Sequence, residues 1–143
     1  MQNEEYKFSG IHFLASYMMC DDECLNNTNA LKQALCDAVK ASGATILDSV
    51  DYVFNPNGYT LAIILSESHT SIHTYPEVKS CFVDLFTCGD KCSYEKFNRV
   101  LSDYLKPKTM SYQIIKRDDD IQIISSQKIC HDNNKNDVLH SLS

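Results

Sequence analysis

The hydrophobic and polar positions along the chain divide it into short periodic segments separated by polar breaks. Alternating or continuous apolar residues predict five strands, at residues 10–19, 44–54, 59–65, 80–88 and 110–115. Two other segments place an apolar residue every three or four positions, which predicts amphipathic helices. The first helix begins near Asn27 and ends at Gly43, and the second begins after Ser93 and ends before Pro107.

The breaks between these segments indicate how the elements connect. Residues 55–58 read Asn-Pro-Asn-Gly, which is typical of a tight turn, so the strands on either side form a hairpin. Residues 21–27 are polar and predict a loop. Residues 66–77 are polar and rich in histidine, and this break is too long for a simple turn.

The predicted order of elements is β-α-β-β-β-α-β, which indicates an α+β fold. Packing both helices on one face of a mostly antiparallel sheet gives a two-layer sandwich. The other face then needs a cover, and a second copy of the chain is the simplest one, so we expect a homodimer.

Residues 1–117 form the single domain that we expect, and residues 118–143 form a C-terminal extension. Within the extension, residues 121–124 favour an additional edge strand. We expect the last ~15 residues to be poorly ordered because they are polar and terminal.

Composition and charge narrow the class of protein. The chain has 143 residues, of which 43% are hydrophobic and 22% charged, with a net charge of −6. Without a basic cluster, nucleic acid and anionic membranes are poor partners. No apolar run approaches the ~20 residues of a membrane span, and the acidic N-terminus does not resemble a signal peptide, so we expect a cytoplasmic protein. The seven cysteines are then expected to be thiols.

The polar break at residues 66–77 holds the strongest candidate chemistry. Ser68 follows Glu67, and His73 lies five residues further on, so a hydroxyl near an imidazole suggests an activated nucleophile. If the strands on either side of the break are neighbours, Cys88 joins Ser68 and His73 at the strand ends. Two other interpretations stay open. Serines and histidines in a loop are commonly solvated or capping residues, and His69, His73 and Cys88 form a weak zinc pattern. Since no fourth ligand is evident, we expect no metal site.

Five stretches of the sequence match a known family. They are Gly10-x-His12, Ser42-Gly43-Ala44-Thr45-Ile46, Phe54-x-Pro56-x-Gly58, Ser66-Glu67-Ser68-His69-x-x-Ile72-His73-Thr74-x-Pro76-Glu77 and Asp84-Leu85-Phe86-Thr87-Cys88-Gly89. Through them the chain resembles the S-adenosylmethionine decarboxylase proenzymes of the short, prokaryotic, pyruvoyl-dependent type. The resemblance covers residues 10–116 with the same order of elements. The fourth stretch is long and unusual, so chance is a poor explanation for it.

The resemblance implies that the chain cleaves itself between Glu67 and Ser68. The Ser68 hydroxyl attacks the preceding carbonyl, and elimination from the resulting ester leaves a pyruvoyl group in place of the serine. His73 matches the base that processing requires, and the Thr60 hydroxyl matches a supporting group that is serine in many relatives. The pyruvoyl carbonyl condenses with the substrate amine, and the imine accepts the electrons released as CO₂ leaves. Cys88 matches the family's proton donor.

The substrate that the resemblance implies is S-adenosylmethionine, whose decarboxylation supplies the aminopropyl donor for spermidine and other polyamines. Phe54 and Tyr75 match rings that hold the adenine, and Glu77 matches the carboxylate that grips the ribose. Two positions depart from the family pattern. Tyr75 is usually tryptophan, and Ser16 stands in a segment where relatives often carry an acidic residue. These departures keep two alternatives open, a pyruvoyl-dependent decarboxylase of another amino acid such as ornithine or arginine, and a non-catalytic regulatory homologue.

Overall fold

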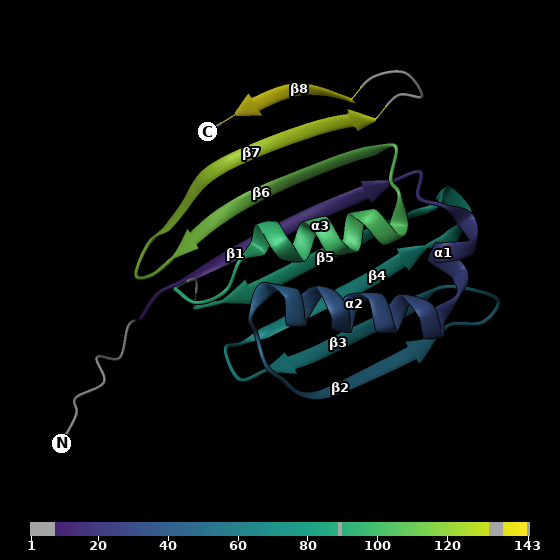
Figure 1. Cartoon of the computed structure of the whole chain (residues 1–143), viewed down its shortest axis with the longest axis horizontal. Helices are drawn as coiled ribbons and strands as arrows, with labels where there is room; N and C mark the ends of the chain where they lie inside the picture. The colour runs from purple at the N-terminus through teal and green to yellow at the C-terminus, as the bar shows by residue number, and fades with distance from the viewer. Residues whose placement is uncertain (1–7, 89, 132–135, 143) are drawn as a thin grey trace.

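The chain folds into one antiparallel sheet with helices on one side, seen in a computed structural model that describes residues 8–88, 90–131 and 136–142 (Figure 1). The eight strands lie in the order β2-β3-β4-β5-β1-β6-β7-β8, and every pair of neighbours is antiparallel. The elements are β1 (Gly10–Met18), α1 (Asp22–Asn26), α2 (Thr28–Ser42), β2 (Ile46–Val53), β3 (Tyr59–Leu65), β4 (His69–Tyr75), the 3₁₀ helix η1 (Pro76–Val78), β5 (Ser80–Thr87), α3 (Tyr94–Leu105), β6 (Thr109–Arg117), β7 (Ile121–His131) and β8 (Asn136–Leu142). The predicted α+β class is confirmed. Gly89 of the last matching stretch and the acidic N-terminal residues lie outside the described residues.

Helices α2 and α3 pack on one face of the sheet (Figure 1). The core between the two layers comes from alternate positions of the central strands and from one stripe of each long helix. Its largest fully buried side chains include Phe13, Tyr17, Leu31, Leu35, Leu61, Ile63, Ile72, Leu85, Phe97 and Leu101. The residues between these positions in the strands point to the opposite face, which we call the open face. Among the described helices, none is long and apolar enough to cross a membrane.

Both long helices end where the sequence predicts. The Asn27 side chain accepts a hydrogen bond from the Ala30 N–H at the start of α2, and Gly43 ends that helix with a φ of 97°. The Ser93 hydroxyl accepts a hydrogen bond from the Lys96 N–H at the start of α3. Each cap satisfies a backbone group that the helix alone leaves without a partner.

The polar break at residues 66–77 contains a central strand, β4, that the periodicity did not predict. It pairs with β3 on one side and with β5 on the other, so β3 and β5 are not neighbours. The buried positions of β4 are Thr70, Ile72 and Thr74. Threonine counts as polar in a hydrophobic pattern, although its branched Cβ favours strands. The Thr70 hydroxyl meets its hydrogen-bonding need by donating to the Asp84 carbonyl oxygen at 2.6 Å.

Residues 22–26 lie in a predicted loop but form the short helix α1. The Asp21 side chain accepts the Cys24 N–H and caps this helix. A single helical turn shows too few apolar positions to reveal a helical period, which is why the pattern indicated a loop.

The C-terminal extension continues the sheet beyond the two helices (Figure 1). The strand expected at residues 121–124 extends to His131 and pairs with β6 along its whole length, and the backbone of β8 pairs with β7. The expected disorder therefore does not hold for residues 129–131. Residues 132–135 and 143 lie outside the described residues.

Gly10 opens β1 beneath the ring of Phe86. A Cβ at position 10 would lie 2.6 Å from two ring carbons of Phe86 and 2.8 Å from the Thr87 carbonyl oxygen. We expect Gly10→Ala to lower the free energy of unfolding by about 1–3 kcal/mol, because the ring and the strand must move apart. Urea unfolding measures the change, with Ser9→Ala as a control that should stay within about 0.5 kcal/mol of the wild type. A Gly10→Ala variant as stable as the control would contradict this steric reason for the glycine.

Candidate active site

Ser68 lies in the turn that joins β3 to β4, at one end of the sheet. The Leu65 N–H donates to the Ser68 carbonyl oxygen at 2.9 Å, which closes the turn. The Glu67 carboxylate accepts the Thr45 N–H at 3.0 Å, and this hydrogen bond is the main reason that the pKa of Glu67 lies below its ordinary value. The peptide bond between Glu67 and Ser68 is therefore anchored on both sides, while the Ser68 side chain is half-buried.

Cys88 lies at the same end of the sheet as Ser68. In the antiparallel pairing of β4 with β5, His69 stands opposite Phe86. Ser68 comes just before His69 and Cys88 comes two residues after Phe86, so both lie just beyond this pair at the same end of the sheet. Cys88 is exposed and carries a free thiol. The strand register thus brings together two of the three residues that the sequence suggested as a cluster.

His73 does not join them, which corrects the expectation that all three lie close together. It stands within β4, five residues and about 16 Å of extended strand away from Ser68. Its Nδ1 atom lies 2.5 Å from the hydroxyl oxygen of Thr60, the residue opposite it on β3. The structure therefore brings Thr60 and His73 together and separates this pair from Ser68 and Cys88 of the same chain.

Aromatic side chains surround His73. The ring centroids of Phe54 and Tyr75 lie 5.9 Å and 4.7 Å from the His73 ring, and the Phe82 ring lies 5.1 Å from that of Tyr75. Glu77 follows in η1, just after β4, and is exposed. The residues expected to hold the substrate therefore gather near His73 and not near the anchored turn.

A hollow of about 480 Å³ lies on the open face beside the Thr60–His73 pair. Its lining includes Ser16, Thr60, His73, Phe82 and Asp84. The volume falls within the ~300–1,000 Å³ of small-molecule sites. Because Ser16 contributes a hydroxyl in place of a carboxylate, Asp84 is the one acidic residue among those that line the hollow.

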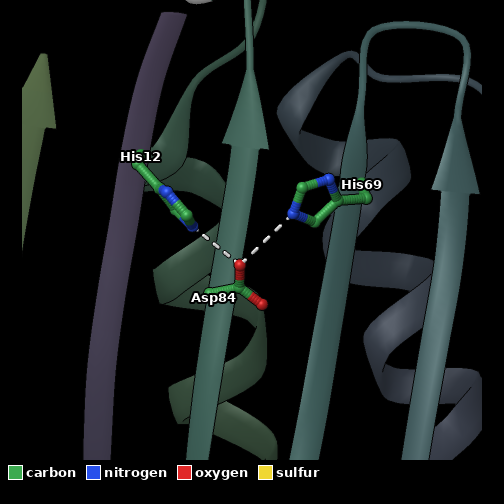
Figure 2. A group of neighbouring side chains, drawn as sticks. All are labelled: His12, His69 and Asp84. Carbon is green, nitrogen blue, oxygen red and sulfur yellow. Dashed lines mark hydrogen bonds and ion pairs between the residues drawn. The ribbon is translucent and has the colours of Figure 1, made fainter. Parts of the chain in front are cut away.

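A further group, which the sequence did not single out, links three strands near the Ser68 end of the open face. The Asp84 atom Oδ2 lies 2.7 Å from Nε2 of His12 and 3.7 Å from Nε2 of His69. Figure 2 shows the two imidazoles on either side of Asp84, with β5 between β1 and β4. Strand alternation carries the signal that would have found this group, since all three residues occupy outward positions of neighbouring strands.

Hydrogen bonds define the proton positions in this group. Burial raises the pKa of Asp84, but hydrogen bonds from His12 and Ser71 outweigh burial, so the pKa lies below its ordinary value. The Ser71 hydroxyl donates to Asp84 Oδ1 at 2.5 Å. An Arg117 guanidinium nitrogen lies 3.2 Å from His12 Nδ1, and because a guanidinium only donates, His12 accepts there and donates from Nε2 to Asp84.

The structure does not assemble the zinc pattern that the sequence suggested. His69 and His73 of the expected zinc pattern lie four residues apart on one strand, about 13 Å, and their rings engage different partners. The ligand atoms of His12, His69 and Asp84 do lie within 4.8 Å of one another. However, a metal would need the lone pair of His12 Nε2. Arg117 donates to His12 Nδ1, so the ring proton sits on Nε2 and no lone pair is available there. These contacts favour a hydrogen-bonded network over metal ligation.

Residues 11–118 match the family model described as S-adenosylmethionine decarboxylase. The chain is 36% identical over 108 residues to the S-adenosylmethionine decarboxylase proenzyme of Methanococcus maripaludis, a match that covers 76% of this chain and 88% of that protein. It is 40% identical over 97 residues to the protein of the same name from Clostridium kluyveri, covering 62% and 77%. The crystal structure of the adenosylmethionine decarboxylase from Aquifex aeolicus is similar with a TM-score of 0.69 at 33% identity, covering 76% and 90%. The family match ends before β7 begins, so β7 and β8 lie outside it.

Proposed function

The chain belongs to the S-adenosylmethionine decarboxylase family, which is a family of enzymes, and we propose that it cleaves itself at Glu67-Ser68 and decarboxylates S-adenosylmethionine with a pyruvoyl group made from Ser68. The observation that carries this proposal is the anchored Glu67-Ser68 turn, with the Cys88 thiol at the same end of the sheet. The product would serve as an aminopropyl donor for spermidine synthesis. Residues 1–117 are the proposed catalytic unit, and residues 118–143 extend its sheet.

The residues around Ser68 fit the formation of a pyruvoyl group at this position. The Ser68 hydroxyl oxygen lies 3.4 Å from an imidazole nitrogen of His69, and the hydrogen bond from Thr45 to Glu67 restrains the residue whose carbonyl is attacked. Once formed, a pyruvoyl group supplies a carbonyl that accepts electrons during decarboxylation. Cys88 is the proposed donor of the proton that replaces CO₂ on the substrate, and its exposed thiol at the same strand end supports this role.

We propose that Thr60 and His73 act on the Ser68 of a second copy. The separation of about 16 Å along β4 prevents His73 from reaching the Ser68 of its own chain. The open face also carries exposed apolar side chains, which are Leu14, Met18, Val50, Tyr52, Ile64 and Phe82. An apolar surface of this kind usually marks an interface. Two copies that pack face to face about a two-fold axis would set the Ser68 end of each against the His73 region of the other, so that the site is complete only in the homodimer.

The aromatic side chains near His73 support S-adenosylmethionine as the substrate. Phe54 and Tyr75 offer flat rings to an adenine, and the Glu77 carboxylate offers two acceptors to ribose hydroxyls. Asp84 adds a negative charge to the hollow, which suits a substrate that carries an amine and a sulfonium. The neutral Ser16 is the observation that favours a second candidate, decarboxylation of another amino acid such as ornithine or arginine.

Carboxyl-labelled substrates test the proposed reaction. We expect the purified protein to release labelled CO₂ from S-adenosylmethionine, with kcat/KM at least about 10²-fold above that for ornithine or arginine, because the aromatic rings and Glu77 find partners only on the nucleoside. Release from ornithine or arginine alone would favour the second candidate and leave the pyruvoyl chemistry intact. A chain that is cut yet releases no CO₂ from any of the three would instead indicate a non-catalytic homologue.

A further inference from the structure

We propose that His69 is the base that takes the Ser68 hydroxyl proton in the first step of self-cleavage, and that Asp84 and His12 hold the His69 ring in the tautomer that this step needs. The proposal rests on the self-cleavage proposed above. It assigns roles to three residues that the processing chemistry of His73 leaves unused.

The first observation is the contact between His69 and Ser68. His69 Nδ1 lies 3.4 Å from the Ser68 hydroxyl oxygen, and among the described residues it is the imidazole nitrogen that contacts the reacting atom. Catalytic contacts in a resting state are often long and tighten when the reaction begins. To accept the hydroxyl proton, Nδ1 must carry a lone pair, so the ring proton must sit on Nε2.

The second observation explains why the proton sits there. His69 Nε2 faces the Asp84 carboxylate at 3.7 Å, and a carboxylate accepts but does not donate. An Nε2–H directed at Asp84 is favoured, whereas an Nε2 lone pair directed at the same oxygen is repelled. Asp84 therefore selects the tautomer that leaves Nδ1 free to act on Ser68, and its charge also stabilises the imidazolium that forms.

The third observation is that Asp84 itself is held in place. Its Oδ2 accepts from His12 Nε2 at 2.7 Å and its Oδ1 accepts from the Ser71 hydroxyl at 2.5 Å. Arg117 in turn donates to His12 Nδ1 and lies 4.5 Å over the Phe86 ring. The carboxylate is thus held by hydrogen bonds from both neighbouring strands, β1 and β4, and these contacts keep it ionised and oriented toward His69.

The Phe86 ring packs against the imidazole rings of both His12 and His69. Its ring centroid lies 5.1 Å from that of His12 and 5.7 Å from that of His69. Because Phe86 occupies the strand position opposite both residues, it fills the space between their rings and limits their rotation. The position of the Phe86 ring depends in turn on Gly10, because a side chain at position 10 would collide with that ring.

The step balances as an acyl shift from nitrogen to oxygen. The Ser68 hydroxyl oxygen forms a bond to the Glu67 carbonyl carbon while its proton passes to His69 Nδ1. The carbon–nitrogen bond between Glu67 and Ser68 then breaks, and the proton on His69 passes to the departing nitrogen, which becomes the free amine of Ser68. His69 returns to its starting state, and no oxidant or other reactant is consumed. Removal of the Ser68 α-proton, which belongs to the next step, is left to His73 of the second copy.

Cleavage of newly made full-length chain tests the proposal. The chain is synthesised in a cell-free reaction, synthesis is stopped, and the uncut fraction is followed by intact mass. We expect His69→Ala to slow cleavage by about 10²–10⁴-fold, while His131→Ala, a histidine on β7 outside this network, cleaves at the wild-type rate. The His69 side chain is 49% exposed, so its removal should preserve the fold, which circular dichroism checks. Because the truncated side chain leaves space beside Ser68 for a small base, added imidazole should restore part of the rate to His69→Ala, which a purely structural role would not allow.

Neutral hydroxylamine identifies the step that each variant blocks, since under brief treatment at neutral pH it cleaves an ester far faster than an amide, and intact mass distinguishes a cut at Glu67-Ser68 from one at Asn57-Gly58. His69→Ala should remain resistant to hydroxylamine because no ester forms, whereas His73→Ala should accumulate a chain that hydroxylamine cuts at Glu67-Ser68. A His69→Ala chain that accumulates this ester, or that is cut at the wild-type rate, would overturn the assignment of His69 and leave the proposed function standing. A wild-type chain that stays uncut with an unmodified Ser68 would instead overturn the proposed function.

The tautomer of the His69 ring, measured by NMR, tests whether Asp84 positions its proton. In uncut Ser68→Ala protein, long-range ¹H–¹⁵N spectra of the histidine ring should show His69 protonated at Nε2. Adding Asp84→Asn should shift His69 toward the Nδ1–H tautomer, because the side-chain amide introduced there can donate to Nε2. In the chain that retains Ser68, Asp84→Asn should also slow cleavage. A His69 ring found protonated at Nδ1 in the protein that retains Asp84 would refute the selection of the tautomer by that residue.

Discussion

Ser68→Ala is expected to leave the whole chain uncut at 16.2 kDa and to abolish decarboxylation. The wild-type protein should instead separate on a denaturing gel into residues 1–67 and 68–143. The effect is complete because alanine lacks the hydroxyl oxygen, which first attacks the Glu67 carbonyl and is then eliminated on the way to the pyruvoyl group. Without that group no carbonyl is available to accept electrons from the substrate.

Intact mass spectrometry checks this result, with Ser66→Ala as the matched control. Ser66 is exposed and lies two residues before Ser68 in the same turn, so its variant should be cut like the wild type. A Ser68→Ala chain that is cut at the same peptide bond would show that another group attacks the Glu67 carbonyl. A Ser68→Ala chain that remains active would show that the electron-accepting group lies elsewhere.

Mixing two inactive variants is expected to restore cleavage. Neither Ser68→Ala nor His73→Ala alone contains a complete site, because each homodimer lacks one of the two groups at both sites. In a mixed dimer, the Ser68 of the His73→Ala chain faces the intact His73 of the Ser68→Ala chain, so one site is complete. With equal amounts and random pairing, about half of the His73→Ala chains pair in this way, and about half should be cut.

Co-expression of the two variants, one with a tag that changes its mass, measures this fraction directly. The matched control pairs His73→Ala with a Ser68→Ala/His73→Ala double variant, which offers no intact His73 and should leave every chain uncut. If the His73→Ala chain stays uncut in both mixtures, the proposal that His73 acts across two copies is wrong. If His73→Ala is cut on its own at the wild-type rate, His73 is not needed for processing at all.

Much of the fold follows from the sequence because most elements bury apolar residues with a regular period. The stripe of α2 and the alternation of β5 are examples, and the caps at Asn27 and Ser93 fix where the helices begin. The strand β4 escaped prediction because Thr70 and Thr74 occupy buried positions. Their hydroxyls hide the two-residue period from a pattern that counts only apolar side chains.

The missed strand also explains the error about the site. Five residues of loop would allow Ser68 and His73 to meet, whereas five residues of strand hold them about 16 Å apart. The network of His12, His69 and Asp84 was missed for a related reason, since its members come from three strands and meet only through the order β4-β5-β1. A sheet order of this kind depends on tertiary pairing, which no single segment of sequence specifies.

The position of Ser68 between β3 and β4 has a consequence for how the two fragments would stay together after the proposed cleavage. Residues 1–67 contribute β1, β2 and β3, and residues 68–143 contribute the other strands, so the two fragments are interleaved: β1 is inserted between β5 and β6. Neither fragment can leave without breaking strand pairs on both sides of β1, which means that a cut molecule stays assembled. Once denatured, however, the fragments must find each other again, so refolding changes from a first-order to a second-order process. The uncut chain can fold from dilute solution at a rate that does not depend on its concentration. Two denatured fragments would refold more slowly as they are diluted, so the cut protein would depend on the fold that its uncut precursor formed.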